Sequence, residues 1–323
     1  MKRFKNILAI YDLGIGAEET LDKAIDLARQ NEADLKVLHV LDVRADYHDL
    51  IQERKKLMNR LLDGINLEKT RFDVIVRSGD LLSEAVSCVE NEQIDLIVAP
   101  TQYGNGWAQL LGTDLTAELM RHTLCPIWVV RPGGEKYYRK IVAAVNAGKK
   151  NASQCPINKR ILEMAASLAE REGADLDVLY AWEFSKEDKE RLLSELPDHV
   201  RYDISQNAHF KAQDALIAVK HAILGSDHKS RAVVRYGDME DAVLDYLKQS
   251  GADLLVSEGL PGNPLVNAFM GNRTLRLLNQ SNCSVLISRP KPQHNMIKTL
   301  SGHPYRGVEL TQTDRVLSEN AQD

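Results

Sequence analysis

The chain contains the same sequence unit twice, and this duplication constrains its fold more than any other feature. The segment "LDKAIDLARQNEADLKVLHV" begins at Leu21 and "LEMAASLAEREGADLDVLYA" begins at Leu162, with nine of twenty positions identical at one constant offset. Two further blocks repeat in the same order: "RSGDLLSEAV" with "RYGDMEDAV", and "HTLCPIWVVRP" with "QSNCSVLISRP". Chance agreement over three blocks is improbable, so we expect two domains of one kind.

Apolar periodicity indicates the fold class of both units. Leu21, Ala24, Ile25 and Ala28 follow the i, i+3, i+4, i+7 spacing of a helix with one buried face. Short, continuous apolar segments alternate with such helices, which is typical of strands buried on both faces of a parallel sheet. We therefore predict an α/β protein with two tandem Rossmann-like domains, each an open five-stranded parallel sheet flanked by helices. The expected strands lie near 6–11, 35–41, 72–76, 96–100 and 127–130, then near 140–145, 176–181, 231–235, 253–257 and 284–288.

The domain borders follow from the repeat. We expect a first domain at 1–132, a linker at 133–138 and a second domain at 139–290, followed by a polar C-terminal tail at 291–323. The repeat offset grows from 141 to 158, so the second unit carries 17 extra residues. These predict an enlarged helical insertion at about 183–230, with a charged helix, a break at Pro197 and an amphipathic helix over about 203–224. Such an insertion is either an enlarged crossover packed on the sheet, or a lid or partner surface.

Composition excludes several function classes. The net charge is −5 and lysine and arginine are dispersed, so nucleic-acid binding is not expected. No apolar run approaches the roughly 18 residues of a membrane span. The four cysteines are scattered singly, without a CxxC pair, which favours a reducing cytoplasm over a disulfide framework or a cysteine-rich metal site. We expect a cytoplasmic protein that contacts neither nucleic acid nor membrane.

The quoted blocks, together with "KNILAIYD", "DLIVAP" and "LLGTD" in the first unit and "KIVAAVN" and "FMGNRT" in the second, resemble the universal stress protein family. The resemblance covers roughly residues 3–290 and is to the tandem type with two such domains in one chain. It implies adenine nucleotide alpha hydrolase-like domains that pair through their fifth strands as an intramolecular pseudo-dimer. Nucleotide-binding members carry an acidic residue after strand one, and Gly-x2-Gly-x9-Gly followed by Ser or Thr after strand four. Glycines let the backbone approach phosphates, and the helix N-terminus offers unpaired N–H groups.

The first unit retains part of this pattern. Asp12 follows strand one and could hold a ribose hydroxyl or magnesium, and Gly112-Thr113 forms the end of the loop. The other two glycine positions are occupied by other residues. His39 and Val40 end strand two, where such folds present side chains or backbone to the crevice.

The second unit departs from the pattern differently. Asn146 replaces the acid, and Asn272 replaces the hydroxyl residue after Gly271. Gly259 and Gly262 have the right mutual spacing, but both lie one position late relative to Gly271. The expected glycine positions hold Glu258, whose carboxylate would repel a phosphate, and Pro261, which lacks the N–H that should contact it.

These observations lead to one functional expectation and two alternatives. We expect a tandem universal stress protein contributing to stress resistance, with a non-catalytic role in ligand or partner binding and degenerate nucleotide loops. The first alternative is a weakly ATP-hydrolysing switch that binds ATP or AMP with magnesium. The second is a scaffold whose tail and insertion recruit a protein partner. We predict no catalytic residue and no metal site, and further association into a homodimer stays open.

Overall fold

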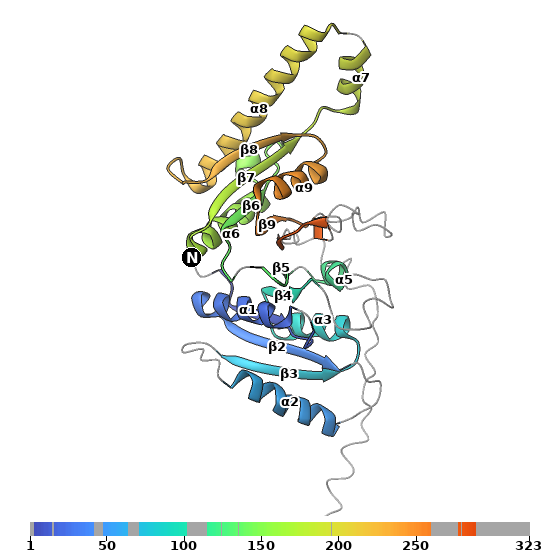
Figure 1. The fold of residues 1–323 in the computed structure, drawn as a ribbon, viewed down its shortest axis with the longest axis vertical. Helices are drawn as coiled ribbons and strands as arrows, with labels where there is room; N and C mark the ends of the chain where they lie inside the picture. Colours follow the sequence, from blue (N-terminus) through green and yellow to red (C-terminus); the bar gives the residue numbers. More distant parts are fainter. Residues whose placement is uncertain are drawn as a thin grey trace, which may run out of the picture. The chain divides into compact units, whose positions relative to one another are not determined.

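The computed structural model describes residues 3–14, 16–41, 48–63, 71–101, 115–123, 125–134, 136–194, 196–259, 277–278 and 280–288. Strands and helices alternate along both repeats (Figure 1). The first repeat contains β1 (Asn6–Ile10), α1 (Ala17–Asn31), β2 (Asp34–Leu41), α2 (His48–Leu62), β3 (Phe72–Ser78), α3 (Leu81–Asn91), β4 (Leu96–Pro100), α5 (Leu115–His122) and β5 (Ile127–Val130). The second contains β6 (Lys140–Ala144), η1 (Ala152–Gln154), α6 (Pro156–Glu172), β7 (Asp175–Trp182), α7 (Lys186–Ser194), α8 (Asp198–Leu224), β8 (Arg231–Tyr236), α9 (Met239–Ser250), β9 (Leu254–Glu258) and β10 (Ser284–Ser288).

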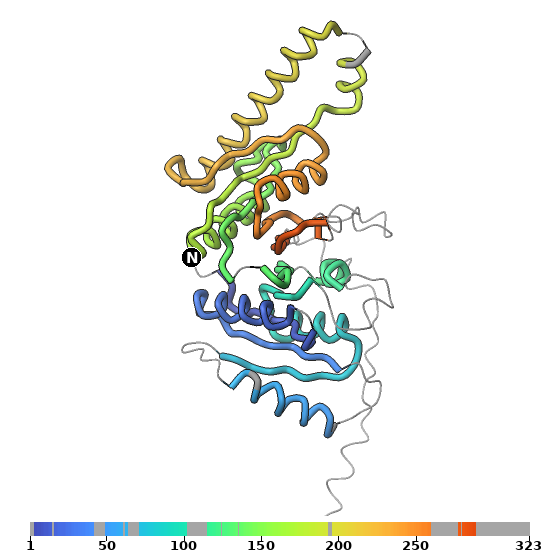
Figure 2. Tube along the Cα trace, viewed as in Figure 1, coloured from blue at the N-terminus to red at the C-terminus, as the bar shows by residue number. Residues whose placement is uncertain are grey.

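The described strands form one continuous sheet in the order β3-β2-β1-β4-β5-β10-β9-β6-β7-β8. Neighbouring strands are parallel within each repeat, whereas β5 and β10 are antiparallel, with Val129 opposite Val285. The predicted α/β class with two Rossmann-like halves is therefore confirmed. The two halves join through their fifth strands, as the family resemblance implied, and the pairing of β5 with β10 carries backbone hydrogen bonds across the seam. Figure 2 shows the chain trace of both halves.

Alternate residues of the strands supply two hydrophobic cores, one on each face of the sheet. In β1, Ile7 and Ala9 belong to the core that α1 and α6 cover, and Leu8 and Ile10 belong to the core that α3, α5 and α9 cover. Because both faces are buried, strands such as β1, β4 and β5 are apolar at nearly every position rather than alternating. This explains why short apolar runs in the sequence predicted the positions of the strands closely.

The segment between β5 and β6 is held against the seam between the halves. Trp128 of β5 is fully buried, and its ring centroid lies 6.0 Å from that of Tyr138. Lys23 of α1 places Nζ 3.7 Å from the Tyr138 ring centroid and donates to the Lys136 carbonyl at 2.6 Å. The Tyr138 N–H donates to Glu172 Oε2 of α6 at 3.1 Å. Both halves therefore fix the segment that connects them.

The repeated Gly-Asp pair has a structural role. Gly79 and Gly237 adopt φ of 136° and 131°, a region that side chains other than glycine rarely occupy. The following residues, Asp80 and Asp238, cap α3 and α9, each accepting a hydrogen bond of 2.9 Å from a backbone N–H of the first helical turn. The motif therefore turns the third strand of each unit into the next helix.

The insertion of the second unit forms two helices, and the longer one begins earlier than the sequence suggested. We expected a helix from about 203, whereas α8 begins at Asp198, directly after Pro197. Its buried residues all lie in its second half: Ala212, Leu216, Val219 and Lys220. The first half of α8 runs past the sheet beside α7 (Figure 1). The apolar period therefore located the helix but not its first turn.

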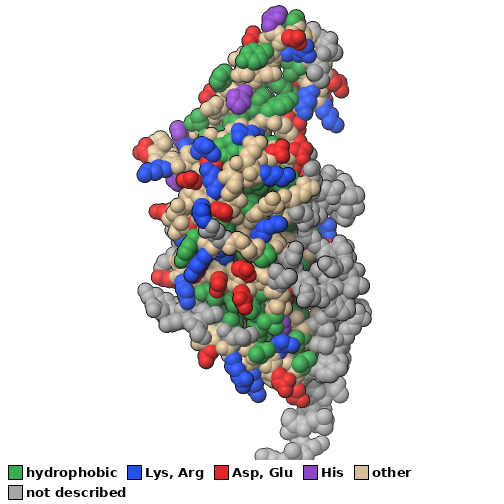
Figure 3. Space-filling view, viewed as in Figure 1, with side chains coloured by type: hydrophobic (Ala, Val, Ile, Leu, Met, Phe, Trp, Pro, Cys, Tyr) green, Lys and Arg blue, Asp and Glu red, His purple; other side chains and the backbone are tan. Residues whose placement is uncertain are grey.

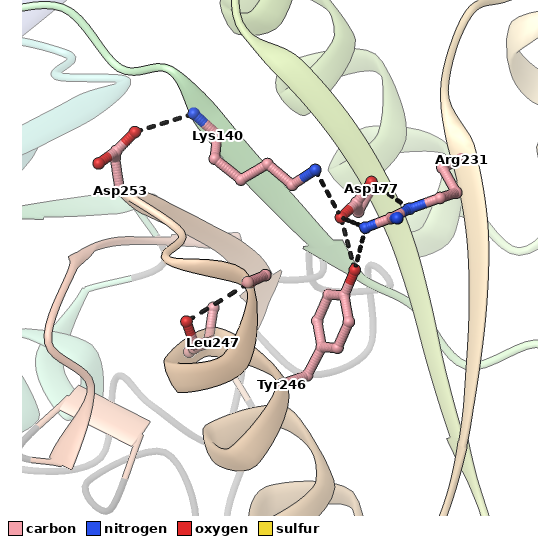
Figure 4. A network of polar contacts seen from close by, with 7 residues as sticks. Lys140, Asp177, Arg231, Tyr246, Leu247 and Asp253 are labelled. Atoms are coloured by element: carbon pink, nitrogen blue, oxygen red, sulfur yellow. Dashed lines mark hydrogen bonds and ion pairs between the residues drawn. The ribbon is translucent and has the colours of Figure 1, made fainter.

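A buried polar network ties the amino ends of the second-unit strands together (Figure 4). Asp177 of β7 is 1% exposed and accepts hydrogen bonds from Arg231 Nη2 at 2.8 Å and Tyr246 Oη at 2.6 Å. Lys140 Nζ lies 2.9 Å from the same carboxylate. Burial raises the pKa of Asp177, but the hydrogen bonds from Arg231, Tyr246 and Lys140 outweigh it, so the net pKa is lowered. The network lies opposite the carboxyl ends of the strands and stabilises the sheet.

Acidic and basic side chains are interspersed on the face shown in Figure 3. No helix in the described part of the chain combines the length and the hydropathy needed to cross a lipid bilayer.

Candidate functional site

The strand order produces one reversal of winding in each half, and we refer to the carboxyl ends of the strands beside these reversals as the first and second crevice. From β1 the chain continues to β2 on one side, while β4 lies on the other, so the direction of winding reverses between β1 and β4. The corresponding reversal in the second half lies between β6 and β9. Doubly wound α/β proteins bind ligands at the carboxyl ends of the strands flanking such a reversal. The predicted site residues in the described part of the chain lie around these two positions.

In the first crevice, Asp12 lies two residues after β1 and is half-buried. Its Oδ1 accepts a hydrogen bond from the Gly14 N–H at 2.9 Å, which closes a tight turn at the start of the loop to α1. The carboxylate thus has a structural task and also places negative charge at the carboxyl end of the strand.

His39 lies behind this turn rather than in open solvent. It is 5% exposed, and its Nδ1 is 2.8 Å from the Tyr11 carbonyl oxygen, so Nδ1 carries the hydrogen and donates it. Burial lowers the pKa of His39, with Arg54 adding to the effect, while the Tyr11 bond and Asp12 oppose it. A neutral His39 therefore supports the backbone of the crevice. Val40 beside it is half-buried and packs on the second core.

In the second crevice, Asn146 repeats the turn without the charge. Its Oδ1 accepts from the Gly148 N–H at 3.1 Å, matching the Asp12–Gly14 bond. Asn158 of α6 holds the Asn146 backbone, accepting from its N–H at 3.2 Å and donating to its carbonyl at 2.9 Å. The amide keeps the loop geometry but cannot provide the negative charge that a magnesium ion would need.

The end of β9 places a carboxyl group at the same crevice. Glu258 is half-buried, and burial raises its pKa while the charge of Lys149 opposes the shift. The next residue, Gly259, donates its N–H to the Ser288 carbonyl at 2.8 Å. Thr101 does the same in the first unit, to Val130 at 3.0 Å. The Gly259 N–H is therefore part of the sheet rather than free to contact a phosphate.

The remaining predicted loop residues, Gly112, Thr113, Gly262, Gly271 and Asn272, lie outside the described residues. Within the described part of the chain, no group of three or more His, Cys, Asp or Glu side chains is arranged to hold a metal ion. Cys125 and Cys283, which share one repeat position, are buried, and burial raises the pKa of Cys283 to about 12. Such a thiol packs in the core and stays protonated at neutral pH.

Sequence reasoning missed two contributors to the second crevice. Lys149 acts on Glu258 electrostatically, and the Tyr180 hydroxyl lies against Gly148, where a side chain on Gly148 would overlap it. Tyr180 occupies the repeat position of His39, 141 residues later. The repeat alignment could have identified it, since the substitution changes the size and polarity of one crevice but not the other.

Two parallel halves covered by helices on both faces, each with a crevice at its winding reversal, define a tandem Rossmann-like α/β protein. The model of the Universal stress protein family matches residues 3–131 and again residues 138–289. The chain therefore belongs to the universal stress protein family, and the tandem resemblance deduced from its repeated motifs is confirmed.

Two similar proteins illustrate the tandem arrangement. The Universal stress protein E homolog of Haemophilus influenzae is 24% identical over 309 residues, covering 89% of this chain and 98% of that protein. The Universal stress protein A homolog 1 of Coxiella burnetii is 28% identical over 130 residues, covering 36% of this chain and 89% of that protein. The first relative spans both halves, whereas the second has the length of one.

Solved structures agree on the fold. A functionally unknown protein from Pseudomonas aeruginosa PAO1 superposes with a TM-score of 0.69 at 17% identity, covering 93% of this chain and 96% of that chain. A universal stress protein from Archaeoglobus fulgidus gives a TM-score of 0.62 at 14% identity, covering 88% and 96%. At these identities the likeness establishes the architecture alone.

Proposed function

We propose that this protein is a non-catalytic ligand- or partner-binding regulator in stress resistance, acting in the cytoplasm, whose second crevice no longer holds a nucleotide. Glu258 is the observation that carries this proposal. Its carboxyl group ends β9 where the family pattern has a glycine that admits phosphate. At ~4 Å, two like charges near a protein surface repel by on the order of 1 to 4 kcal/mol.

One further observation supports the proposal. His39, the side chain at the first crevice most suited to acid–base chemistry, is buried and hydrogen-bonded to the Tyr11 carbonyl. A general base must reach the proton that it removes, and His39 lies behind the turn.

The alternative is a switch that binds ATP or AMP with magnesium in the first crevice, and Asp12 favours it. The carboxylate is half-buried at the winding reversal, and carboxylate oxygens are the ligands that magnesium prefers. Gly112 and Thr113 would complete such a site. Weak ATP hydrolysis would accompany binding in this version of the function.

One experiment separates the two functions. The purified full-length chain is examined by mass spectrometry for bound small molecules, and its thermal unfolding is followed with and without Mg-ATP and AMP. The proposal predicts no stoichiometric adenine nucleotide and no shift in Tm. A shift in Tm that Asp12→Asn abolishes and Glu258→Gln leaves intact would establish the alternative in the first crevice. Asn is the matched replacement, since Asn146 makes the same turn in the second half. Bound ATP lost in Gly262→Ala would overturn the proposal for the second crevice.

We also propose the domain borders 1–132 and 139–290, with a linker at 133–138 and a tail at 291–323. The two ranges matched by the family model support these borders. The insertion at about 183–230 and the tail are the segments that we propose for contact with a protein partner, including a second copy of the chain.

A further inference from the structure

The insertion of the second half borders an open cavity of about 520 Å³ at the carboxyl ends of β7 and β8. A volume of this size accommodates a small organic molecule, since ligand pockets usually measure ~300 to 1,000 Å³. The cavity is separate from the crevices at the two winding reversals, because it is formed by β7, β8 and the α7–α8 hairpin.

The sheet side of the cavity is aromatic. Trp182 ends β7, Tyr236 ends β8, and Phe184 follows Trp182 by two residues. The ring of Trp182 lies 5.0 Å from that of Tyr236 and 5.3 Å from that of Phe184, both in edge-to-face arrangements. Tyr236 is 55% exposed, so this ring cluster is open to a ligand. The first unit has Leu41 and Ser78 at the positions of Trp182 and Tyr236, so the aromatic wall belongs to the second half alone.

The helical side of the cavity is polar along α8, whereas α7 contributes the apolar Leu192 beside Lys189. Arg201, Ser205 and His209 of α8 recur every fourth residue and therefore lie on one face, with Gln206 beside them. A hairpin that closed only on itself would place apolar residues on this face. Instead, α8 presents hydrogen-bonding groups opposite an aromatic wall, and this combination is typical of ligand pockets.

The charges around the cavity favour an anion. Its described lining contains the cations Lys189 and Arg201 and no carboxylate. Lys189 pairs with Glu183 at 2.6 Å and Arg201 pairs with Asp198, but the partner carboxylates are 44% and 91% exposed. Exposed ion pairs contribute only about 0 to 1 kcal/mol, so an acidic ligand can displace these partners at little cost.

We propose that this cavity binds a small organic acid with a flat aromatic body. The ring stacks on Trp182 and Tyr236, and the acidic group lies between Lys189 and Arg201. Nothing in this proposal depends on nucleotide binding in either crevice.

The test uses two probes of the same shape on the full-length chain: naphthoate, which is an anion, and naphthylmethanol, which is neutral. Isothermal titration calorimetry measures the affinity of each. We expect one naphthoate per chain, bound more tightly than naphthylmethanol. Tyr236→Ala should weaken both probes about tenfold, which corresponds to about 1.4 kcal/mol, and Tyr236→Phe should restore binding. Arg201→Gln should weaken naphthoate and leave naphthylmethanol unchanged.

Matched controls come from the same two helices. Phe210 is 57% exposed on α8 and Arg191 is exposed on α7, and neither lines the cavity. Phe210→Ala and Arg191→Gln should leave both affinities unchanged. Equal affinity for the two probes, or naphthoate binding that Tyr236→Ala and Arg201→Gln do not affect, would overturn the proposal. Failure of both probes to bind the intact chain would also overturn it, since the cavity would then be closed by another part of the protein.

Discussion

The buried Asp177 network allows a prediction of stability with a magnitude. Asp177→Asn keeps the size of the side chain and removes its charge, so Lys140 loses its counterion while its side chain is only 18% exposed. Breaking a buried ion pair by removing one partner costs about 3 to 5 kcal/mol. The Arg231 side chain is 62% exposed and returns to water, so its share of the loss is that of a surface pair, about 0 to 1 kcal/mol. We therefore expect the free energy of unfolding to fall by about 3 to 6 kcal/mol, which is the sum of the two contributions.

The assay is urea unfolding followed by far-ultraviolet circular dichroism at neutral pH. The matched control is Asp34→Asn, which removes an ion pair of 3.0 Å to Arg71, whose side chain is 90% exposed. This control should cost less than about 1 kcal/mol. A loss for Asp177→Asn no larger than that for Asp34→Asn would refute the argument that burial makes the network strong.

The pH dependence of the same variant provides a second check. The pKa of Asp177 is lowered in the folded protein, so its contribution is present above the ordinary carboxyl pKa of about 3.9 and is lost as the pH falls through the folded value. The stability difference between wild type and Asp177→Asn should be constant from about pH 5 to 8 and shrink below about pH 4. A difference that grew on acidification would contradict this sign.

Two further predictions concern the second crevice and the cysteines. Gly148→Ala should destabilise the protein by about 1 to 3 kcal/mol, because the new methyl group overlaps the Tyr180 hydroxyl. Adding Tyr180→Phe to this variant should recover part of the loss. Thermal unfolding of the wild type, the two single variants and the double variant measures both effects. At about pH 8, a thiol reagent should modify the partly exposed Cys155 in the native protein and the three buried cysteines only after unfolding. Burial excludes the reagent and raises the pKa of Cys283 to about 12. Rapid modification of all four cysteines without denaturant would contradict the packing described.

Much of the fold was predictable because the strands are buried on both faces. The run from Leu96 to Pro100 is apolar at every position, and the strand predicted at 96–100 coincides with β4. The start of α8 was predicted about five residues late because residues 198–202 contain no buried side chain, so no apolar period marked them. Pro197 and Asp198 were the available signals, as proline presets the backbone before a helix and an acid favours its first turn.

The candidate site was predictable only in part. Asp12 and Asn146 were located by the repeat, but their shared role in a turn is a property of backbone geometry that one sequence does not display. The aromatic wall depends on Trp182 and Tyr236, which are 54 residues apart and become neighbours only because β7 pairs with β8, placing the two residues opposite each other. Such non-local pairing cannot be read from local spacing.

The antiparallel pairing of β5 with β10 has a consequence for how the two halves evolve. If this seam joined two separate chains, its occupancy would depend on protein concentration, and both copies would necessarily carry identical residues. Within one polypeptide the partner strand is always present, and each copy can accumulate its own substitutions. Asp12 in the first half corresponds to Asn146 in the second, and Leu41 corresponds to Trp182. A symmetric homodimer could not encode such differences. Covalent linkage therefore allows the two halves of this protein to have different functions.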